Sequence, residues 1–88
     1  YAMQYTVKIF LQSGQRQIDS FDVQHDEPYN LGTVAANTAF LILEVPVMVE
    51  VWDGERRSCV NYKPGLPCPP FQATIEMVRD RIMEAING

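Results

Sequence analysis

Alternating hydrophobic and polar residues mark two segments of the chain as β-strands. The first segment spans residues 4–12, and its hydrophobic residues are Tyr5, Val7, Ile9 and Leu11. The second segment contains four alternating valines, Val45, Val47, Val49 and Val51, which are separated by Pro46, Met48, Glu50 and Trp52. Because successive side chains of a strand point to opposite faces, a period of two predicts strands that are buried on one face.

Each of these strands is predicted to turn back as a hairpin. Gly14 follows the first strand, and Asp53-Gly54 follows the later one, where we expect a type I′ turn. The return strands are expected near residues 16–24 and 56–62. In the first of them the hydrophobic residues do not share one parity, which indicates a β-bulge or irregular pairing.

The hydrophobic period then changes to that of a helix in two places. In residues 26–43 the stripe consists of Leu31, Val34, Ala35, Thr38, Leu41 and Ile42. Pro28 suits a first helical turn, and Asp26 and Glu27 favour the positive end of the helix dipole. In residues 71–87 the stripe consists of Ile75, Val78, Ile82, Ala85 and Ile86.

The element order ββαββα predicts an α+β fold, a two-layer sandwich of a four-stranded antiparallel sheet with both helices on one face. We expect residues 1–88 to form a single domain. Two strand orders remain open. The hydrophobicity of the first and third strands favours placing them at the centre, whereas a circularly permuted ferredoxin-like arrangement would put the third strand at an edge. The two halves also match at an offset of 40 residues, which is either an internal repeat or chance spacing.

The charge distribution narrows the classes of partner. The net charge is −4, and every charged residue from Gln17 to Glu55 is acidic, before Arg56, Arg57 and Lys63 follow. A pI near 4.7 disfavours nucleic-acid binding, whose usual mark is a basic domain. No hydrophobic run is long enough for a membrane span, and no N-terminal secretory pattern is visible, so a cytoplasmic location is expected.

The candidate catalytic and metal-binding residues form no recognisable motif. Cys59 and Cys68 are separated by eight residues, which fits neither a zinc-ligand pair nor a Cys-x-x-Cys redox motif. Two free thiols are favoured, while a disulfide and a reactive pair stay open. His25 is the lone histidine, and nothing in its spacing requires contact with a thiol. We therefore expect no catalytic residue, no metal and no cofactor.

Residues 58–70 contain four of the six prolines. Pro64, Pro67 and Pro70 fit the Pro-x-x-Pro spacing twice, but the basic residue that orients such ligands is missing. We expect this segment to be a stiff connector between a strand and the last helix, with Pro70 at the start of that helix.

Strand parity gives the one candidate functional surface. If the valines face the helices, Met48 and Trp52 face away, and Phe10 and Lys8 do so by the same parity. The predicted surface is an apolar patch rimmed by charges, made of Phe10, Met48, Trp52, Lys8, Glu50 and Arg57. Monomers seldom expose such a patch without use. Alternatively, Trp52 folds over the hairpin end and Phe10 over a loop.

The sequence therefore favours a non-enzymatic interaction or assembly domain that self-associates, as a dimer, through an open sheet face or an apolar edge strand. Another protein is an alternative partner. Two further functions stay open: a small-molecule-binding accessory domain that uses the aromatic face, and an acidic decoy of a nucleic-acid-binding protein.

Overall fold

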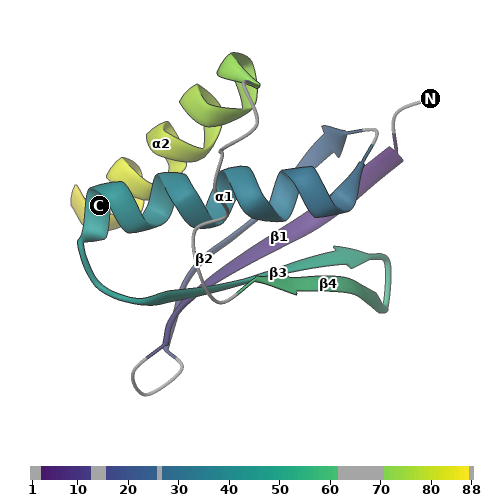
Figure 1. The fold of residues 1–88 in the computed structure, drawn as a ribbon, viewed down its shortest axis with the longest axis horizontal. Helices are drawn as coiled ribbons and strands as arrows, with labels where there is room; N and C mark the ends of the chain where they lie inside the picture. Colours follow the sequence, from purple (N-terminus) through teal and green to yellow (C-terminus); the bar gives the residue numbers. More distant parts are fainter. Residues whose placement is uncertain (1–2, 13–15, 26, 62–70, 88) are drawn as a thin grey trace.

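A computed structural model describes residues 3–12, 16–25, 27–61 and 71–87, without the side chains of Cys59 and Asn61. Its elements follow the predicted order (Figure 1). The strands are β1 (Met3–Leu11), β2 (Gln17–His25), β3 (Val47–Asp53) and β4 (Arg56–Asn61), and the helices are α1 (Pro28–Leu43) and α2 (Gln72–Asn87).

The four strands form one antiparallel sheet in the order β2-β1-β3-β4, and both helices lie on one side of it (Figure 1). The central strands are thus β1 and β3, as their hydrophobicity predicts. Their inward side chains are fully buried, including Val7, Ile9, Val49 and Val51 at 0% exposure. Because a central strand is covered by neighbours on both sides, the most hydrophobic strands gain most from that position.

The irregular pairing predicted in the first hairpin is confirmed. Ile9 lies opposite Asp19, while the next residue, Phe10, lies opposite Gln17, so Ile18 is the extra residue of a bulge. The bulge also places Asp19 beside the core residue Ile9. Asp19 therefore faces the helical layer, where it contacts α2.

The turn between β3 and β4 differs from the prediction. Asp53 pairs with Arg56, so the two central residues are Gly54 and Glu55. The φ angle of Gly54 is +63°, and in the described part of the chain Glu44 is the one non-glycine residue with positive φ. A positive φ at the first central position alone is the pattern of a type II′ turn, whereas type I′ would also demand it of Glu55.

Both ends of α1 are capped. The Glu27 carboxylate accepts hydrogen bonds from the backbone N–H groups of Tyr29 at 2.9 Å and Asn30 at 2.6 Å, and Pro28 occupies the first turn as predicted. Asp26 lies outside the described residues. At the other end Glu44 adopts φ 56°, and its N–H donates to the Phe40 carbonyl at 2.8 Å. This is the left-handed cap at which glycine is the usual residue.

The two helices are buried to different extents. Every residue of α1 from Leu31 to Ala39 is buried, so this part of the helix is enclosed on all sides. In α2 only Val78 and Ile82 are buried among the described residues. Arg81 of α2 donates to Asp19 at 3.0 Å and lies 5.4 Å from the centre of the Phe21 ring.

Three parts of the predicted core are wrong. Leu41 is 76% exposed, Ile86 is 51% exposed and Ala85 is also exposed, because these residues lie beyond the strips of helix surface that touch the sheet or the other helix. Val45 is 41% exposed, because β3 begins only at Val47 and the alternation of a strand does not extend to a bend before it. Within the described residues, no helix combines the length and hydrophobicity needed to cross a membrane.

Candidate functional site

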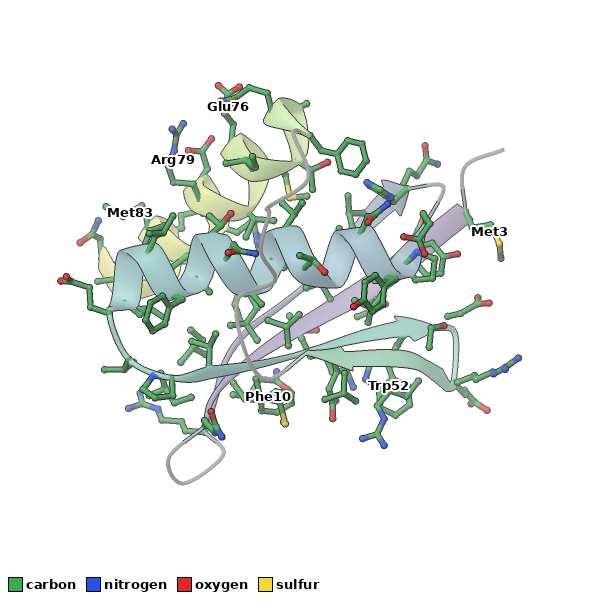
Figure 2. All side chains as sticks on the ribbon, in the orientation of Figure 1. Met3, Phe10, Trp52, Glu76, Arg79 and Met83 are labelled. Carbon is green, nitrogen blue, oxygen red and sulfur yellow. The ribbon has the colours of Figure 1, made fainter. Side chains whose placement is uncertain are left out.

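The sheet has one face that no helix covers, and we call it the outer face. Figure 2 shows Phe10 and Trp52 on this side of the sheet, opposite the helices. From Val47 onward the alternation in β3 has the predicted direction, since Val47, Val49 and Val51 are buried in the core beneath the helices. The residues between them, Met48, Glu50 and Trp52, point to the outer face.

The strand register arranges the part of the outer face that holds the predicted residues in three rows, and beyond the first row Gln4 pairs with Gln24. The first, the Trp52 row, contains Asp22, Thr6, Trp52 and Arg57, in the order β2, β1, β3, β4. The second, the Lys8 row, contains Ser20, Lys8, Glu50 and Val60 in the same order. The third, the Phe10 row, contains Gln17, Phe10 and Met48. All six residues predicted for the functional surface thus lie in three adjacent rows.

A second bulge brings Arg57 into the first row. Val51 pairs with Cys59, but the next residue of β3, Trp52, pairs with Arg57, which leaves Ser58 as the extra residue. In a regular ladder Ser58 would stand opposite Trp52 on the outer face, and Arg57 would have the opposite parity. The bulge moves Arg57 to the outer face, where its Nη1 lies 3.3 Å from Glu50 Oε2.

Glu50 is the centre of a network of polar contacts on the outer face. Trp52 Nε1 donates to Glu50 Oε1 at 2.9 Å, and Arg57 contacts the other carboxylate oxygen. The Lys8 amine lies 4.6 Å from the centre of the Trp52 ring, a cation–π contact. The Glu50 side chain is only 12% exposed, so a largely buried carboxylate is held between the Trp52 indole and the Arg57 guanidinium, and Lys8 covers the indole ring.

The apolar residues of the outer face are buried or partly buried, and not fully exposed to solvent. Met48 is 7% exposed, and Phe10 and Trp52 are partly buried. Phe10 lies directly opposite Met48 in the register, and Trp52 lies against Lys8 and Glu50, so the side chains cover one another along and between rows. The result is a packed and ordered surface.

The two edges of the outer face carry opposite charges. On the β2 side, Asp22 Oδ1 accepts a hydrogen bond from the Thr6 hydroxyl at 2.7 Å. On the β4 side stands Arg57, whose side chain is 53% exposed. The acidic edge and the basic edge belong to the same row, the Trp52 row, and lie at its two ends.

A second set of apolar side chains was missed by sequence reasoning. Five large hydrophobic residues near the C-terminal ends of the helices are exposed by more than a third: Phe40 and Leu41 of α1, Val45 just after it, and Met83 and Ile86 of α2. The C-terminal ends of both helices lie at the same end of the molecule (Figure 1). We call these five residues the helix-end set. Phe40 and Met83 are hydrophobic residues that lie outside the predicted helix stripes, so the sequence could have marked them as exposed. Leu41 and Ile86 belong to the predicted stripes and were therefore assigned to the core.

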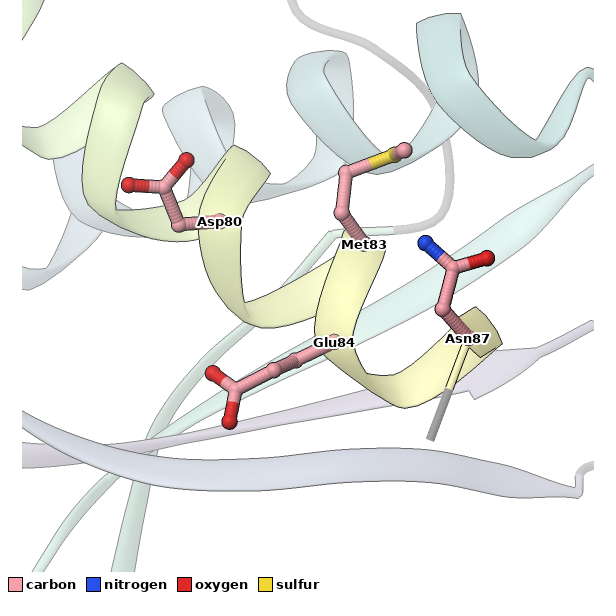
Figure 3. A pocket seen from close by; sticks show the side chains of 4 residues that line it. All are labelled: Asp80, Met83, Glu84 and Asn87. Carbon is pink, nitrogen blue, oxygen red and sulfur yellow. The ribbon is translucent and has the colours of Figure 1, made fainter.

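Two depressions lie along α2 rather than on the outer face. One, of about 490 Å³, is lined by Asp80, Met83, Glu84 and Asn87, all from α2 itself (Figure 3). The other, of about 180 Å³, is lined by Asp19, Arg81, Glu84 and Ala85. The first is formed by a single helix, without the convergent groups from several elements that specific ligand sites usually have.

His25 has a structural role in the described fold. It is 9% exposed, and its Nδ1 accepts a hydrogen bond from the Glu27 N–H at 3.1 Å. Its ring meets Phe71 edge-on, with the ring centres 5.2 Å apart. The imidazole thus holds the chain at the entry to α1 and against the start of α2.

The other sequence candidates lie outside the described residues. This applies to the side chain of Cys59, to Cys68 and to the proline-rich segment 62–70 with Pro64, Pro67 and Pro70, so the interpretations of thiols and connector stay predictions. Within the described ranges, no three His, Cys, Asp or Glu side chains gather as a metal site would require.

A scan of protein-family models, a search of curated proteins and a search of solved structures each found no match to this chain. Function is therefore inferred from the geometry of the described surfaces.

Proposed function

We propose that this chain is a non-enzymatic assembly domain that self-associates through the outer face. The observation that carries the proposal is the register of β1 with β3, which places Phe10 beside Met48 and Trp52 beside Thr6 on a face without helices. Aromatic residues, Met and Arg are the residue types enriched at the centres of protein interfaces.

The polar network favours binding as well. Glu50 holds the Trp52 indole through Nε1 and holds Arg57 through its second oxygen. Trp and Arg are the commonest hot-spot residues, and a side chain that is already fixed loses less conformational entropy on docking. The outer face therefore presents two preorganised hot-spot residues beside an apolar pair.

The sheet edges are less suited to the same task. β4 begins with Arg56 and Arg57, and β2 contains the bulge at Ile18. Charges and bulges at edge strands are the common means by which proteins avoid edge-to-edge pairing. The face, and not an edge, is thus the favoured surface.

Binding of a small molecule is less well supported. An open sheet face has no walls of its own, and the two depressions found in the described part of the chain lie along α2. A second subunit on the outer face would supply the missing cover without any such cavity.

Sedimentation equilibrium up to several hundred micromolar protein tests the proposal. The wild-type chain is expected to dimerise, and Trp52→Lys and Phe10→Gln are each expected to weaken the dimer by about thirtyfold, the effect of losing one hot-spot side chain. Circular dichroism and a melting curve check that each variant remains folded.

The matched control is Leu41→Lys, which places the same charge at a more exposed apolar residue on the helical side. It is expected to dimerise as the wild type does. A wild-type chain that is strictly monomeric at every concentration, or a folded Trp52→Lys variant that dimerises normally, would overturn the proposal.

A further inference from the structure

We propose that the outer faces of two copies pack together about a two-fold axis that runs parallel to the strands, between β1 and β3. This inference rests on the proposed function, because it specifies the partner and the symmetry of the same surface. It follows from the positions of the charged residues in the three rows.

The symmetry operation is simple to follow on the rows. An axis along the strands exchanges the two halves of each row, so β1 faces β3 of the second copy, and β2 faces β4. Rows stay opposite their own counterparts. Each residue then faces the residue that stands at the mirrored place in its own row.

Under this operation every charge of the outer face meets its opposite. In the Lys8 row, Lys8 faces Glu50 of the second copy, and the reverse pair forms by symmetry. In the Trp52 row, Asp22 at the β2 end faces Arg57 of the second copy at the β4 end. Four ion pairs thus form from four charged positions that lie in two rows.

The apolar residues match under the same operation. In the Phe10 row, Phe10 faces Met48 of the second copy, and the two symmetric pairs meet as one cluster of four side chains. Trp52 faces Thr6 of the second copy, whose methyl group suits an indole face. Aligned sheets pack about 10 Å apart with a crossing angle near −30°, which keeps residues close to the axis opposite one another.

Other two-fold axes in the plane between the sheets give poorer pairing. An axis along β1 would place Lys8 against Lys8 of the second copy, and an axis along β3 would do the same for Glu50. An axis across the strands, between the first two rows, would set Arg57 against Val60 and Asp22 against Ser20, without one ion pair. The charge pattern therefore selects the central axis along the strands.

The size of the surface sets the expected affinity. Four strands spaced about 4.8 Å apart make a face roughly 20 Å wide. Such a face is at the small end of stable protein interfaces, so the dimer is expected at micromolar or higher concentration. Measurements must extend to that range.

Exchange of charges between two variants tests the axis. Lys8→Glu places two acidic residues opposite each other at both symmetric sites, and Glu50→Lys does the same with two basic residues. Each variant alone is expected to dimerise at least tenfold more weakly than the wild type, roughly the effect of two like-charge contacts. Mixed one to one, the two variants restore both pairs and are expected to form a heterodimer within about threefold of wild-type affinity.

A second pair of variants tests the charges at the ends of the Trp52 row. Asp22→Lys and Arg57→Glu form the same exchange there; Asp22→Lys leaves the contacts of Trp52 and Glu50 intact, whereas Arg57→Glu removes the Arg57–Glu50 contact, so circular dichroism checks that it stays folded. The controls are Arg79→Glu on α2 and Glu55→Lys in the β3–β4 turn, which change the net charge equally away from the outer face. Neither control is expected to change dimerisation, alone or in a mixture.

The possible results separate the two proposals. A strictly monomeric wild-type chain overturns both of them. If the wild type dimerises and Trp52→Lys prevents it, but neither charge-exchanged mixture binds better than its separate variants, the face is the interface and the central axis is wrong. The axis is supported if both mixtures recover near wild-type affinity and the two control variants dimerise as the wild type does.

Discussion

The two helices of this fold have the same length and the same order in the chain relative to a hairpin, but they are buried very differently. Each has 16 residues and follows a β-hairpin. Yet α1 is enclosed from Leu31 to Ala39, whereas α2 buries only Val78 and Ile82 among its described residues. The place of a helix in the layer, and not its length or order in the chain, decides how much of it the fold covers.

The composition of α1 explains how it can be enclosed. Ala35, Ala36 and Ala39 are all at 0% exposure, and small side chains let neighbouring elements approach a helix closely. By contrast, α2 places Arg79, Asp80 and Glu84 on an exposed surface. The difference predicts that the free energy of unfolding depends mainly on α1, while α2 is held by Val78, Ile82, the partly buried Met77 and the contacts of Arg81 with Asp19 and Phe21.

The largest expected effect is in α1. Leu31→Ala removes a side chain at 0% exposure and is expected to lower the free energy of unfolding by about 2–5 kcal/mol, the range for buried leucines that leave a cavity. Urea unfolding followed by circular dichroism measures it. Leu41→Ala, in the same helix but 76% exposed, is the matched control and is expected to change it by less than about 0.5 kcal/mol. Equal losses in the two variants would show that burial does not distinguish these positions.

The next effect concerns the attachment of α2. Arg81 Nη2 lies 3.0 Å from Asp19 Oδ1, while Arg81 Nε and Asp19 Oδ2 are buried without a hydrogen-bond partner among the described residues. Arg81→Ala would leave the Asp19 carboxylate, 14% exposed, without its cation, and we expect a loss of about 1–3 kcal/mol. The Asp19→Ala/Arg81→Ala double variant is expected to lose less than the sum of the two single variants.

A double-mutant cycle in urea, with hydrogen exchange of the α2 amides, measures this coupling. Faster exchange confined to α2 in Arg81→Ala would show that the ion pair fixes this helix to β2. Strictly additive losses, with unchanged exchange in α2, would contradict that role.

The contrast between the helices also shows which features the sequence could predict. Local rules predicted the strand alternation, the irregular hairpin around Ile18 and the first turn of α1 at Pro28, because each depends on residues close together in the chain. The parity of β3 likewise predicted that Met48 and Trp52 share a face. The structure confirms these features, except that the alternation of β3 does not extend back to Val45.

Features that depend on packing between distant segments could not be predicted. A helical stripe predicts one buried face, so the enclosure of Ala36 and Asn37 on the other sides of α1 has no local signal. The exposure of Ile86 depends on where α2 leaves its contact with α1. On the outer face, the contact of Lys8 with Trp52 depends on the register of β1 with β3, which the sequence does not specify. The position of Arg57 depends on a β-bulge in β4 that no residue of the turn predicts.

A smaller effect is expected at the end of α1. Glu44 has φ 56°, a conformation that is strained for a residue with a Cβ atom. Glu44→Gly is expected to raise the free energy of unfolding by about 0.5–1 kcal/mol, because the relief of strain exceeds the added freedom of the unfolded chain. Thermal and urea unfolding measure the change.

The control at this position is Glu44→Gln, which removes the charge and keeps the Cβ atom. It is expected to gain only a few tenths of a kcal/mol, from removing an anion at the negative end of the helix dipole. If the glutamine variant gains as much as the glycine variant, the dipole and not the backbone conformation explains the stabilisation.

The smallest effects are expected in the helix-end set, where the two helices resemble each other. Leu41→Lys and Ile86→Lys alter side chains that are 76% and 51% exposed, so each is expected to change the free energy of unfolding by less than about 0.5 kcal/mol. Both variants are also expected to dimerise as the wild type does, because the proposed interface lies on the opposite side of the sheet. The same sedimentation series that includes Trp52→Lys measures this. If Ile86→Lys abolished dimerisation while Trp52→Lys did not, the exposed side chains at the helix ends would be the interface, and the packed outer face would serve only the stability of the sheet.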